Sequence, residues 1–329
     1  MKKVVIIGTG GTISASGKDR LDFKDYQSGS FTLTEMIDQL PEIRENAQIV
    51  TFQLKNFSST NLTPAHWLQL KKLTEEYLAD PEIAGVVITH GTSTLEETAY
   101  FLHLTVNSSK PVILTGSQRP FTALGSDAGI NLLQSVRVAL APESIGKGVL
   151  VVLNGQISSA REVTKTSKFQ LETFHSGQLG FLGSVDVDGT VQYYRQPTRR
   201  HTVHSEFAQL EIKELPEVAI LYSYVGMKPD LIYAVMEQKM YRGIVIATMG
   251  AARLSNQEKE ALEKAMEQGI QVVLGSRIPE GRVVAYAESQ TLPFIWGDNL
   301  LPHKARILLM LSLLKSDHAT EIQAFFDQY

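Results

Sequence analysis

The chain has 329 residues and 43% of them are hydrophobic, which is more apolar material than one compact core usually absorbs, so two domains are expected. Lys and Arg total 31 against 35 Asp and Glu, and this net charge of -4, without a long run of either sign, favours neither nucleic acid nor a membrane surface as a partner. Cysteine is absent, which excludes a disulfide framework, thiolate catalysis and a zinc site built on sulfur.

The N-terminus begins with a short apolar run. Residues 1–3 lead directly into residues 4–7, Val-Val-Ile-Ile, which are too few for the hydrophobic region of a signal peptide or for a membrane span. We therefore expect a buried strand that opens the first domain, and we expect the protein to be cytoplasmic.

The first half of the chain alternates short apolar runs with helix-like segments, which is typical of a mostly parallel sheet with crossover helices. One helix is expected to begin after Thr63, with Pro64 at its first position. Another is expected to begin with a capping box formed by Thr94 and Glu97. The predicted strands are residues 4–7, 49–54, 85–89, 111–115 and 148–153.

The second half repeats this alternation after a break. Residues 186–215 have a weaker hydrophobic rhythm, and residues 195–201 are polar and basic, which is typical of an exposed connection. Ser255 and Glu258 are spaced to cap a later helix, and a last, strongly apolar helix at 303–314 is expected to pack on a second sheet. The remaining expected elements are strands at 218–222, 243–248 and 270–275 and a helix near 229–240.

These patterns predict an α/β fold with two domains. The larger N-terminal domain, residues 1–190, has a mostly parallel sheet flanked by helices. Residues 191–214 are predicted as a linker. Residues 215–329 are predicted as a smaller C-terminal α/β domain.

Ligands of parallel α/β sheets bind beyond the carboxyl ends of the strands, so the residues after each apolar run are candidates for a site. Residues 8–13 read Gly-Thr-Gly-Gly-Thr-Ile, where glycines let the backbone approach a ligand and two hydroxyls lie in one tight loop. The segment lacks the third glycine and the acidic strand end of a dinucleotide site, and the Gly-Lys-Ser/Thr of a phosphate loop. From these residues alone, a structural turn and a functional loop remain equal alternatives.

Two further segments follow predicted strands. Residues 90–94, His-Gly-Thr-Ser-Thr, contain hydroxyls that are also ordinary capping residues, and a buried histidine is more often structural than catalytic. Residues 159–166 place Lys165 in a loop of a kind where most lysines are solvated. A lysine kept neutral by desolvation and by a second hydroxyl can nevertheless act as a base, so Thr92 with Lys165 would form such a pair and Thr12 would be the attacking group.

At these positions the chain resembles the bacterial asparaginase and glutaminase family. The Thr-Gly-Gly-Thr-Ile of residues 9–13 is similar to the family's nucleophile loop. The His-Gly-Thr-Ser-Thr-Leu-Glu-Glu of residues 90–97 is similar to its second signature, normally His-Gly-Thr-Asp-Thr. Further similar segments, which extend the resemblance over nearly the whole chain, lie at 115–120, 127–132, 160–166, 276–281 and 304–306.

The resemblance implies the chemistry and the residues that perform it. Thr12 would attack a side-chain amide with help from Tyr26 on a mobile flap, and Thr92 and Lys165 would be the second hydroxyl and the base. Ammonia would leave and water would hydrolyse the ester, which needs no metal or organic cofactor. Backbone N–H groups of the glycine-rich loop and near Thr92 would stabilise the oxyanion.

The resemblance also implies how the substrate is held. Ser59 and Thr60 match positions that bind its α-carboxylate and α-ammonium ends, and Gly11 and Gly91 are further expected binding positions. Glu288 matches an acidic residue that a neighbouring subunit presents to the ammonium group. A homodimer or homotetramer with sites at the interface is therefore implied.

Two residues depart from the family pattern. Ser93 stands where the family has an aspartate that orients the lysine and pairs with the substrate's ammonium group, and this loss would weaken ammonium binding by about 1–3 kcal/mol. Arg253 lies in a segment where the family more often has a small polar residue from the partner subunit, and it adds a cation near the ammonium end.

Three interpretations follow from these departures. In the first, the chain is an asparaginase slowed by an engineered change at Ser93. In the second, it is a natural amidase for a substrate that lacks the α-ammonium group or carries an extra carboxylate. In the third, it is a non-catalytic relative that binds an amino acid as a sensor. A nucleotide-binding protein or oxidoreductase is the alternative from another class, and the incomplete glycine fingerprints disfavour it.

Overall fold

The computed structural model describes residues 2–286 and 292–329, so Glu288 lies outside the described residues. The chain divides into two compact units, Met1–Glu211 and Ile212–Tyr329. In the part of the chain that is described, no helix is long and apolar enough to cross a membrane.

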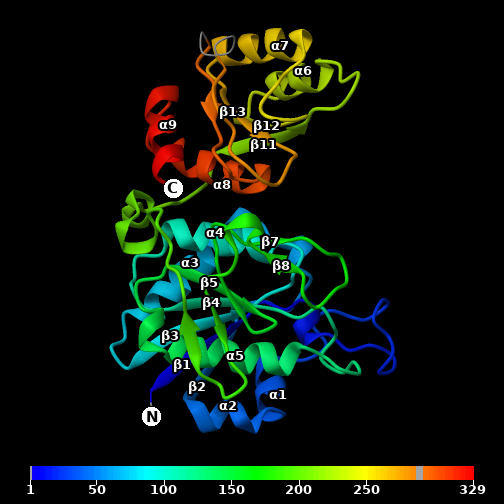
Figure 1. Cartoon of the computed structure of the whole chain (residues 1–329), viewed down its shortest axis with the longest axis vertical. Helices are drawn as coiled ribbons and strands as arrows, with labels where there is room; N and C mark the ends of the chain where they lie inside the picture. The colour runs from blue at the N-terminus through cyan, green and yellow to red at the C-terminus, as the bar shows by residue number, and fades with distance from the viewer. Residues whose placement is uncertain (1, 287–291) are drawn as a thin grey trace. The chain divides into compact units, whose positions relative to one another are not determined.

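The first unit is built on a mixed sheet whose described strands follow the order β10-β9-β6-β5-β4-β3-β1-β2 (Figure 1). Five of these strands run parallel, because each is joined to the next by a helix that crosses a face of the sheet. Their carboxyl ends therefore meet at one edge. The five parallel strands are β1 (Lys3–Gly8), β2 (Gln48–Gln53), β3 (Ile83–Thr89), β4 (Val112–Thr115) and β5 (Val149–Leu153).

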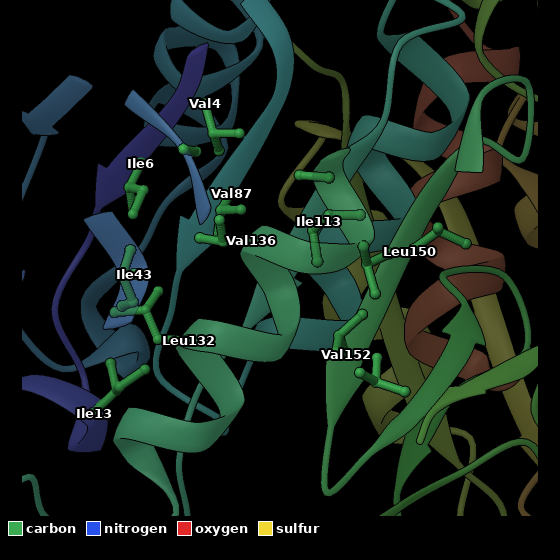
Figure 2. Close-up of a cluster of buried hydrophobic side chains, with 14 of the residues drawn as sticks. Val4, Ile6, Ile13, Ile43, Val87, Ile113, Leu132, Val136, Leu150 and Val152 are labelled. Atoms are coloured by element: carbon green, nitrogen blue, oxygen red, sulfur yellow. The ribbon is translucent and has the colours of Figure 1, made fainter. Parts of the chain in front are cut away.

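Both faces of this sheet are covered, which explains why its strands read as nearly continuous apolar runs. The helices α3 (Pro64–Leu78) and α4 (Leu95–Thr105) pack on one face, and α5 (Ala128–Leu140) packs on the other with the short helices α1 (Leu33–Asp38) and α2 (Pro41–Asn46). Figure 2 shows side chains of α5 directed at alternate residues of the strands. The labelled core includes Val4, Ile6, Val87, Ile113, Leu132, Val136, Leu150 and Val152, all of them fully buried.

The first sheet continues beyond its parallel part with antiparallel strands. β6 (Gln156–Ser159) pairs with β5, β9 (Gly183–Val185) pairs with β6, and β10 (Val191–Tyr193) pairs with β9. The linker predicted from residue 191 therefore begins too early, because its first residues are hydrogen-bonded into the sheet. Phe207, in the middle of the same segment, is fully buried.

The second unit is a smaller α/β layer structure around the parallel sheet β11-β12-β13-β14. Its strands are β11 (Glu217–Tyr222), β12 (Tyr241–Thr248), β13 (Gln271–Ser276) and β14 (Ile295–Trp296). The helices α6 (Asp230–Glu237) and α7 (Asn256–Glu267) share one apolar cluster with the strands, and α8 (Pro302–Ser312) packs on β11, β12 and β13. The predicted α/β class and the mostly parallel larger sheet are confirmed.

Three local predictions have different outcomes. The capping box of Ser255 and Glu258 is present, with the serine hydroxyl accepting from the Glu258 amide and the carboxylate accepting in return. The box predicted for Thr94 and Glu97 is wrong, because the Thr94 hydroxyl donates to the Ser59 carbonyl at 3.0 Å instead. The apolar helix predicted at 303–314 is not the last one, since α9 (Ala319–Gln328) follows it and contacts β14.

Candidate active site

The glycine-rich loops after β1 and β3 lie in direct contact at the carboxyl edge of the first sheet. A Cβ atom on Gly11 would lie 2.3 Å from Gly91 Cα, so this approach requires glycine at position 11. Gly11 also has φ +92°, a conformation that residues with a Cβ rarely adopt. Because Thr12 follows one glycine and Thr92 follows the other, the contact places two hydroxyl-bearing loops side by side.

Thr12 begins a short 3-10 turn (Thr12–Ser14) and is hydrogen-bonded to the flap that follows. Its Oγ1 lies 3.0 Å from the Oη of Tyr26. The flap returns to the loop through a β-bridge between Ser16 and Gln27, with backbone bonds of 3.2 and 3.0 Å. This bridge holds Tyr26 near Thr12, so a threonine hydroxyl and a phenol that can exchange a proton with it are already paired.

The flap itself is ordered by Asp22 and by a neighbouring loop. Backbone N–H groups of Lys18 and Asp25 donate to the Asp22 carboxylate, and these bonds hold the pKa of Asp22 below its usual range. The Arg119 guanidinium lies 5.4 Å from the centre of the Phe23 ring, within the range of a cation–π contact. The flap is therefore tied to the loop that follows β4.

Thr92 and Lys165, which are 73 residues apart, form the second hydroxyl pair. Lys165 Nζ donates to Thr92 Oγ1 at 2.7 Å. Lys165 is carried by β7 (Thr164–Lys165), whose hairpin partner is β8 (Phe174–His175), and its backbone N–H donates to Glu96 Oε1 in the first turn of α4. Burial lowers the pKa of Lys165, while the Glu96 carboxylate raises it, and the net direction is downward. The lysine is thus shifted toward the neutral form that a base requires.

Gln118 is a further residue of this group, to which the sequence analysis assigned no role. Its Oε1 accepts the hydroxyl proton of Thr92 at 3.1 Å. Its backbone N–H donates to Asp127 Oδ2 at 3.0 Å, and Asn131 Nδ2 donates to the same oxygen at 3.0 Å. The segments containing these residues were recognised as similar to the family, but a glutamine in a loop has no local signal that names its partner. Spacing alone did not reveal the contact.

His90 supports the second glycine from within the core. It is fully buried, and burial lowers its pKa to about 4, so it is neutral near pH 7. Its Nδ1 donates to the Gly91 carbonyl at 2.8 Å, and its Nε2 accepts from the Thr98 hydroxyl at 2.9 Å. Trp67 Nε1 donates to that hydroxyl at 2.9 Å. The bonds are structural, which is the role that a buried histidine has most often.

The remaining predicted binding residues of the first unit differ in exposure. Ser59 is buried against the second glycine, since a Cβ atom on Gly91 would lie 2.7 Å from its Oγ. Thr60 is exposed and its hydroxyl lies 2.9 Å from Ser58 Oγ. Ser93 is also exposed, although Thr92 beside it is buried, and it supplies no charge to the site.

Two of the predicted residues, Arg253 and Glu288, belong to the second unit. Arg253 is exposed, and its guanidinium lies 4.2 Å from the centre of the Tyr286 ring. Glu288 lies outside the described residues. Among the residues that the structure describes, no group of three or more His, Asp or Glu side chains is arranged to hold a metal ion.

The fold and the two hydroxyl pairs have the features of a hydrolase with a hydroxyl nucleophile, placed where parallel α/β sheets bind their ligands. Comparisons with known proteins give the family. Residues 3–199 match the family model "Asparaginase, N-terminal", and residues 217–326 match "Glutaminase/Asparaginase C-terminal domain". The chain belongs to the asparaginase family and is an amidohydrolase.

Its similarity to named relatives extends over the full length. The chain is 38% identical over 329 residues to L-asparaginase 2 of Bacillus subtilis (strain 168), covering 100% of this chain and 87% of that protein. It is 36% identical over 332 residues to L-asparaginase 2 of Escherichia coli (strain K12), covering 100% and 94%. The crystal structure of a probable cytoplasmic L-asparaginase from Campylobacter jejuni superposes with a TM-score of 0.95 at 37% identity, covering 100% of both chains.

Proposed function

We propose that the chain hydrolyses the side-chain amide of L-asparagine to L-aspartate and ammonia. The proposal rests on one observation: two loops that meet at the Gly11–Gly91 contact each carry a threonine whose hydroxyl already has a proton-transfer partner. Thr12 is paired with Tyr26, and Thr92 is paired with Lys165. The names of its relatives support the choice of asparagine as the substrate.

In the proposed reaction, Thr12 Oγ1 attacks the amide carbon, and its proton passes to the Tyr26 oxygen as the phenol gives its own proton to the leaving nitrogen. The C–N bond breaks, the nitrogen leaves as ammonia, and an ester to Thr12 remains. Water adds to this ester, the bond to Thr12 breaks, and the carboxylate product leaves while the threonine regains its proton. Backbone N–H groups of the two glycine loops are suited to stabilise the oxyanion in both halves of the reaction.

Lys165 is proposed as the base that acts through Thr92. A lysine accepts a proton only in its neutral form, and burial lowers the pKa of this lysine. The short bond from its Nζ to Thr92 Oγ1 provides a direct path for the proton between them. Ser59, buried beside Gly91, and Thr60 are proposed to bind the α-carboxylate and α-ammonium ends.

A second candidate function rests on Ser93. An uncharged, exposed hydroxyl at this position gives an α-ammonium group no opposite charge, which favours an amide that lacks this group. Arg253, if a partner subunit brings it to the site, also disfavours an α-ammonium group, because like charges repel. The second candidate is therefore an amidase for a succinamate-like substrate.

Ammonia release from purified protein separates the two candidates. The panel is L-asparagine, D-asparagine, L-glutamine and succinamate, with Thr12→Ala as the blank. L-Asparagine as the best substrate by kcat/KM supports the first function, and succinamate as the best supports the second. Ligand binding without ammonia release from any amide would overturn both and favour a sensor.

The variant Ser93→Asp tests the charge directly. For an asparaginase weakened at this position, the added carboxylate should raise kcat/KM for L-asparagine by about 10-fold or more, because it gives the ammonium group a charge partner. The control is Ser167→Asp on the hairpin that carries Lys165. An unchanged or lower rate would show that serine suits the natural substrate.

We further propose the assembly and the location that the resemblance implies. Glu288 and Arg253 from a neighbouring subunit would complete the site in a homodimer or homotetramer, which light scattering of the purified chain tests. A cytoplasmic location is supported by the description of the Campylobacter jejuni structure, and cell fractionation tests it.

A further inference from the structure

The Thr92 hydroxyl lies between Lys165 and Gln118, and its single proton can point to only one of them at a time. Lys165 Nζ donates to Thr92 Oγ1 at 2.7 Å, and Thr92 donates to Gln118 Oε1 at 3.1 Å. While the proton points to Gln118, the threonine can only accept from the lysine. This arrangement favours the protonated amine, because a charged donor makes the stronger hydrogen bond and a neutral amine would find no proton to accept from Thr92.

The orientation of the Gln118 amide is set by bonds on its other side. Its Nε2 donates to the Gln170 carbonyl at 3.1 Å and points toward the Lys168 carbonyl at 3.5 Å. A flipped amide would place Oε1 against these two carbonyl oxygens, which cannot donate. The oxygen of Gln118 is therefore kept toward Thr92.

The backbone of Gln118 is equally constrained. Both oxygens of Asp127 accept from successive N–H groups, Oδ2 from Gln118 and Oδ1 from Arg119, each at 3.0 Å. Asn131 Nδ2 donates to Asp127 Oδ2 and to the Gly116 carbonyl, both at 3.0 Å. The loop after β4 is thus clamped to the start of α5, which leaves Gln118 little freedom to turn away from Thr92.

We propose that Gln118 is a positioning residue that directs the Thr92 proton away from Lys165 and so favours the charged lysine until the hydroxyl turns. The proposal rests on the proposed role of Lys165 as the base. Transfer of a proton to the lysine requires the Thr92 hydroxyl to leave Gln118 and point at Nζ, and loss of the Gln118 acceptor makes that orientation the favoured one.

The titratable groups around this bond come from three elements. Lys165 lies on β7, Glu96 on α4 accepts from the Lys165 backbone N–H at 3.2 Å, and Asp127 precedes α5 and contacts Gln118 only through its backbone N–H. A change of the Gln118 side chain to another neutral one alters none of these charges. Any resulting shift in the protonation of Lys165 therefore reports the lost acceptor.

The first measurement is the pH dependence of kcat in Gln118→Met, which keeps the chain length but has no comparable acceptor. Its acid limb, where activity rises as the base becomes neutral, should move to lower pH by about one unit, the size expected for one hydrogen bond to a charged network. Gln118→Leu is the second variant should the first not fold. Gln192→Met, at an exposed glutamine of β10 in the same unit, should leave the limb where it is. A limb that stays in place or moves to higher pH in Gln118→Met would overturn the proposal.

A second measurement does not depend on turnover. In protein labelled with 13C at the lysine side chains, the Lys165 signal is assigned by its loss in Lys165→Met and then titrated. Gln118→Met should lower its titration midpoint, and an unchanged midpoint would overturn the proposal. If the unaltered chain releases ammonia from no amide, the proposed function fails, but this titration still decides the role of Gln118.

Discussion

Gly11 lies so close to Gly91 that a Cβ atom on the first would stand 2.3 Å from the Cα of the second. Real Cβ atoms do not come this near, so a side chain at Gly11 must push the two loops apart, while a Cβ on Gly91 would clash first with Ser59 Oγ at 2.7 Å. This contact lets the Thr12 and Thr92 loops approach closely, and the pairing of β1 with β3 and the bonds from Thr9 to the Thr89 carbonyl hold them there.

We expect Gly11→Ala to lose at least about 100-fold in kcat, because a shift of about 1 Å between reacting groups has effects of that size. The φ of +92° at Gly11 adds strain to the steric clash. The measurement is ammonia release from L-asparagine, together with a thermal melt to show that the variant is folded. Gly250→Ala is the matched control, because a Cβ there meets no atom within 4 Å. Near-normal activity in a folded Gly11→Ala protein would contradict the proposed site.

Tyr26→Phe isolates the bond between the flap and Thr12, the proposed nucleophile. The ring and its packing remain, and only the Oη at 3.0 Å from Thr12 Oγ1 is removed. We expect kcat to fall by about 100-fold while KM changes little, because proton transfer in the transition state is lost and substrate binding is not. Steady-state kinetics check this. A raised KM with normal kcat would instead show that the tyrosine binds substrate.

Lys165→Met should reduce kcat by about 1,000-fold, the contribution typical of a general base. Lys165→Arg should not restore it, because a guanidinium stays protonated and cannot accept a proton. Lys168→Met, which changes an exposed lysine three residues away, is the control and should remain active. Recovery of activity in Lys165→Arg would mean that the position needs a positive charge rather than a base.

The pH profile follows from the same lysine. Burial lowers the pKa of Lys165 below its usual 10.5, and the proposed base is active only when neutral. Activity should therefore rise with increasing pH through the pKa of this lysine, with the midpoint of the limb below 10.5. Measuring kcat across the pH range checks this, and a limb that falls as the lysine loses its proton would contradict the role of a neutral base.

His201 should make the first unit less stable in acid. Burial is the main cause that lowers its pKa from 6.5 to about 4, so the unfolded chain takes up a proton first as the pH falls. The stability that the neutral, buried His201 allows is fully present above about pH 6.5. As the pH falls toward 4, the free energy of unfolding decreases by up to about 3 kcal/mol. We expect His201→Gln to flatten this part of the curve of unfolding free energy against pH.

The fluorescence of Trp67 gives the unfolding signal of the first unit once Trp296, the other tryptophan, is replaced by Phe. His318→Gln, at an exposed position of the second unit, is the control and should leave the curve unchanged. His90 is also buried with a pKa of about 4, so part of the acid sensitivity should remain in His201→Gln. An identical slope with and without His201 would contradict this account.

The amino-acid sequence determined the parts of this protein that depend on local pattern. Apolar runs predicted the parallel strands of both sheets to within about two residues, except the two-residue strand β14, which was not predicted. A strand covered on both faces must be apolar throughout, and β14 is too short to give such a run. Since parallel strands end at one edge, the residues after them marked the place of the site before any contact was known. Together with the family resemblance, this rule made Thr12, Thr92 and Lys165 the candidate residues.

The tertiary structure decided which of these groups are partners. Thr92 meets both Gln118 and Lys165 only because three segments that are far apart in the sequence converge, and no local sequence pattern predicts such an approach. The Thr94 hydroxyl likewise donates to the Ser59 carbonyl instead of capping the helix, because the folded chain brings that carbonyl within hydrogen-bond distance. Local patterns specify strands and helices through backbone and burial preferences, but the partner of a polar side chain is whichever group the folded chain brings within hydrogen-bond distance.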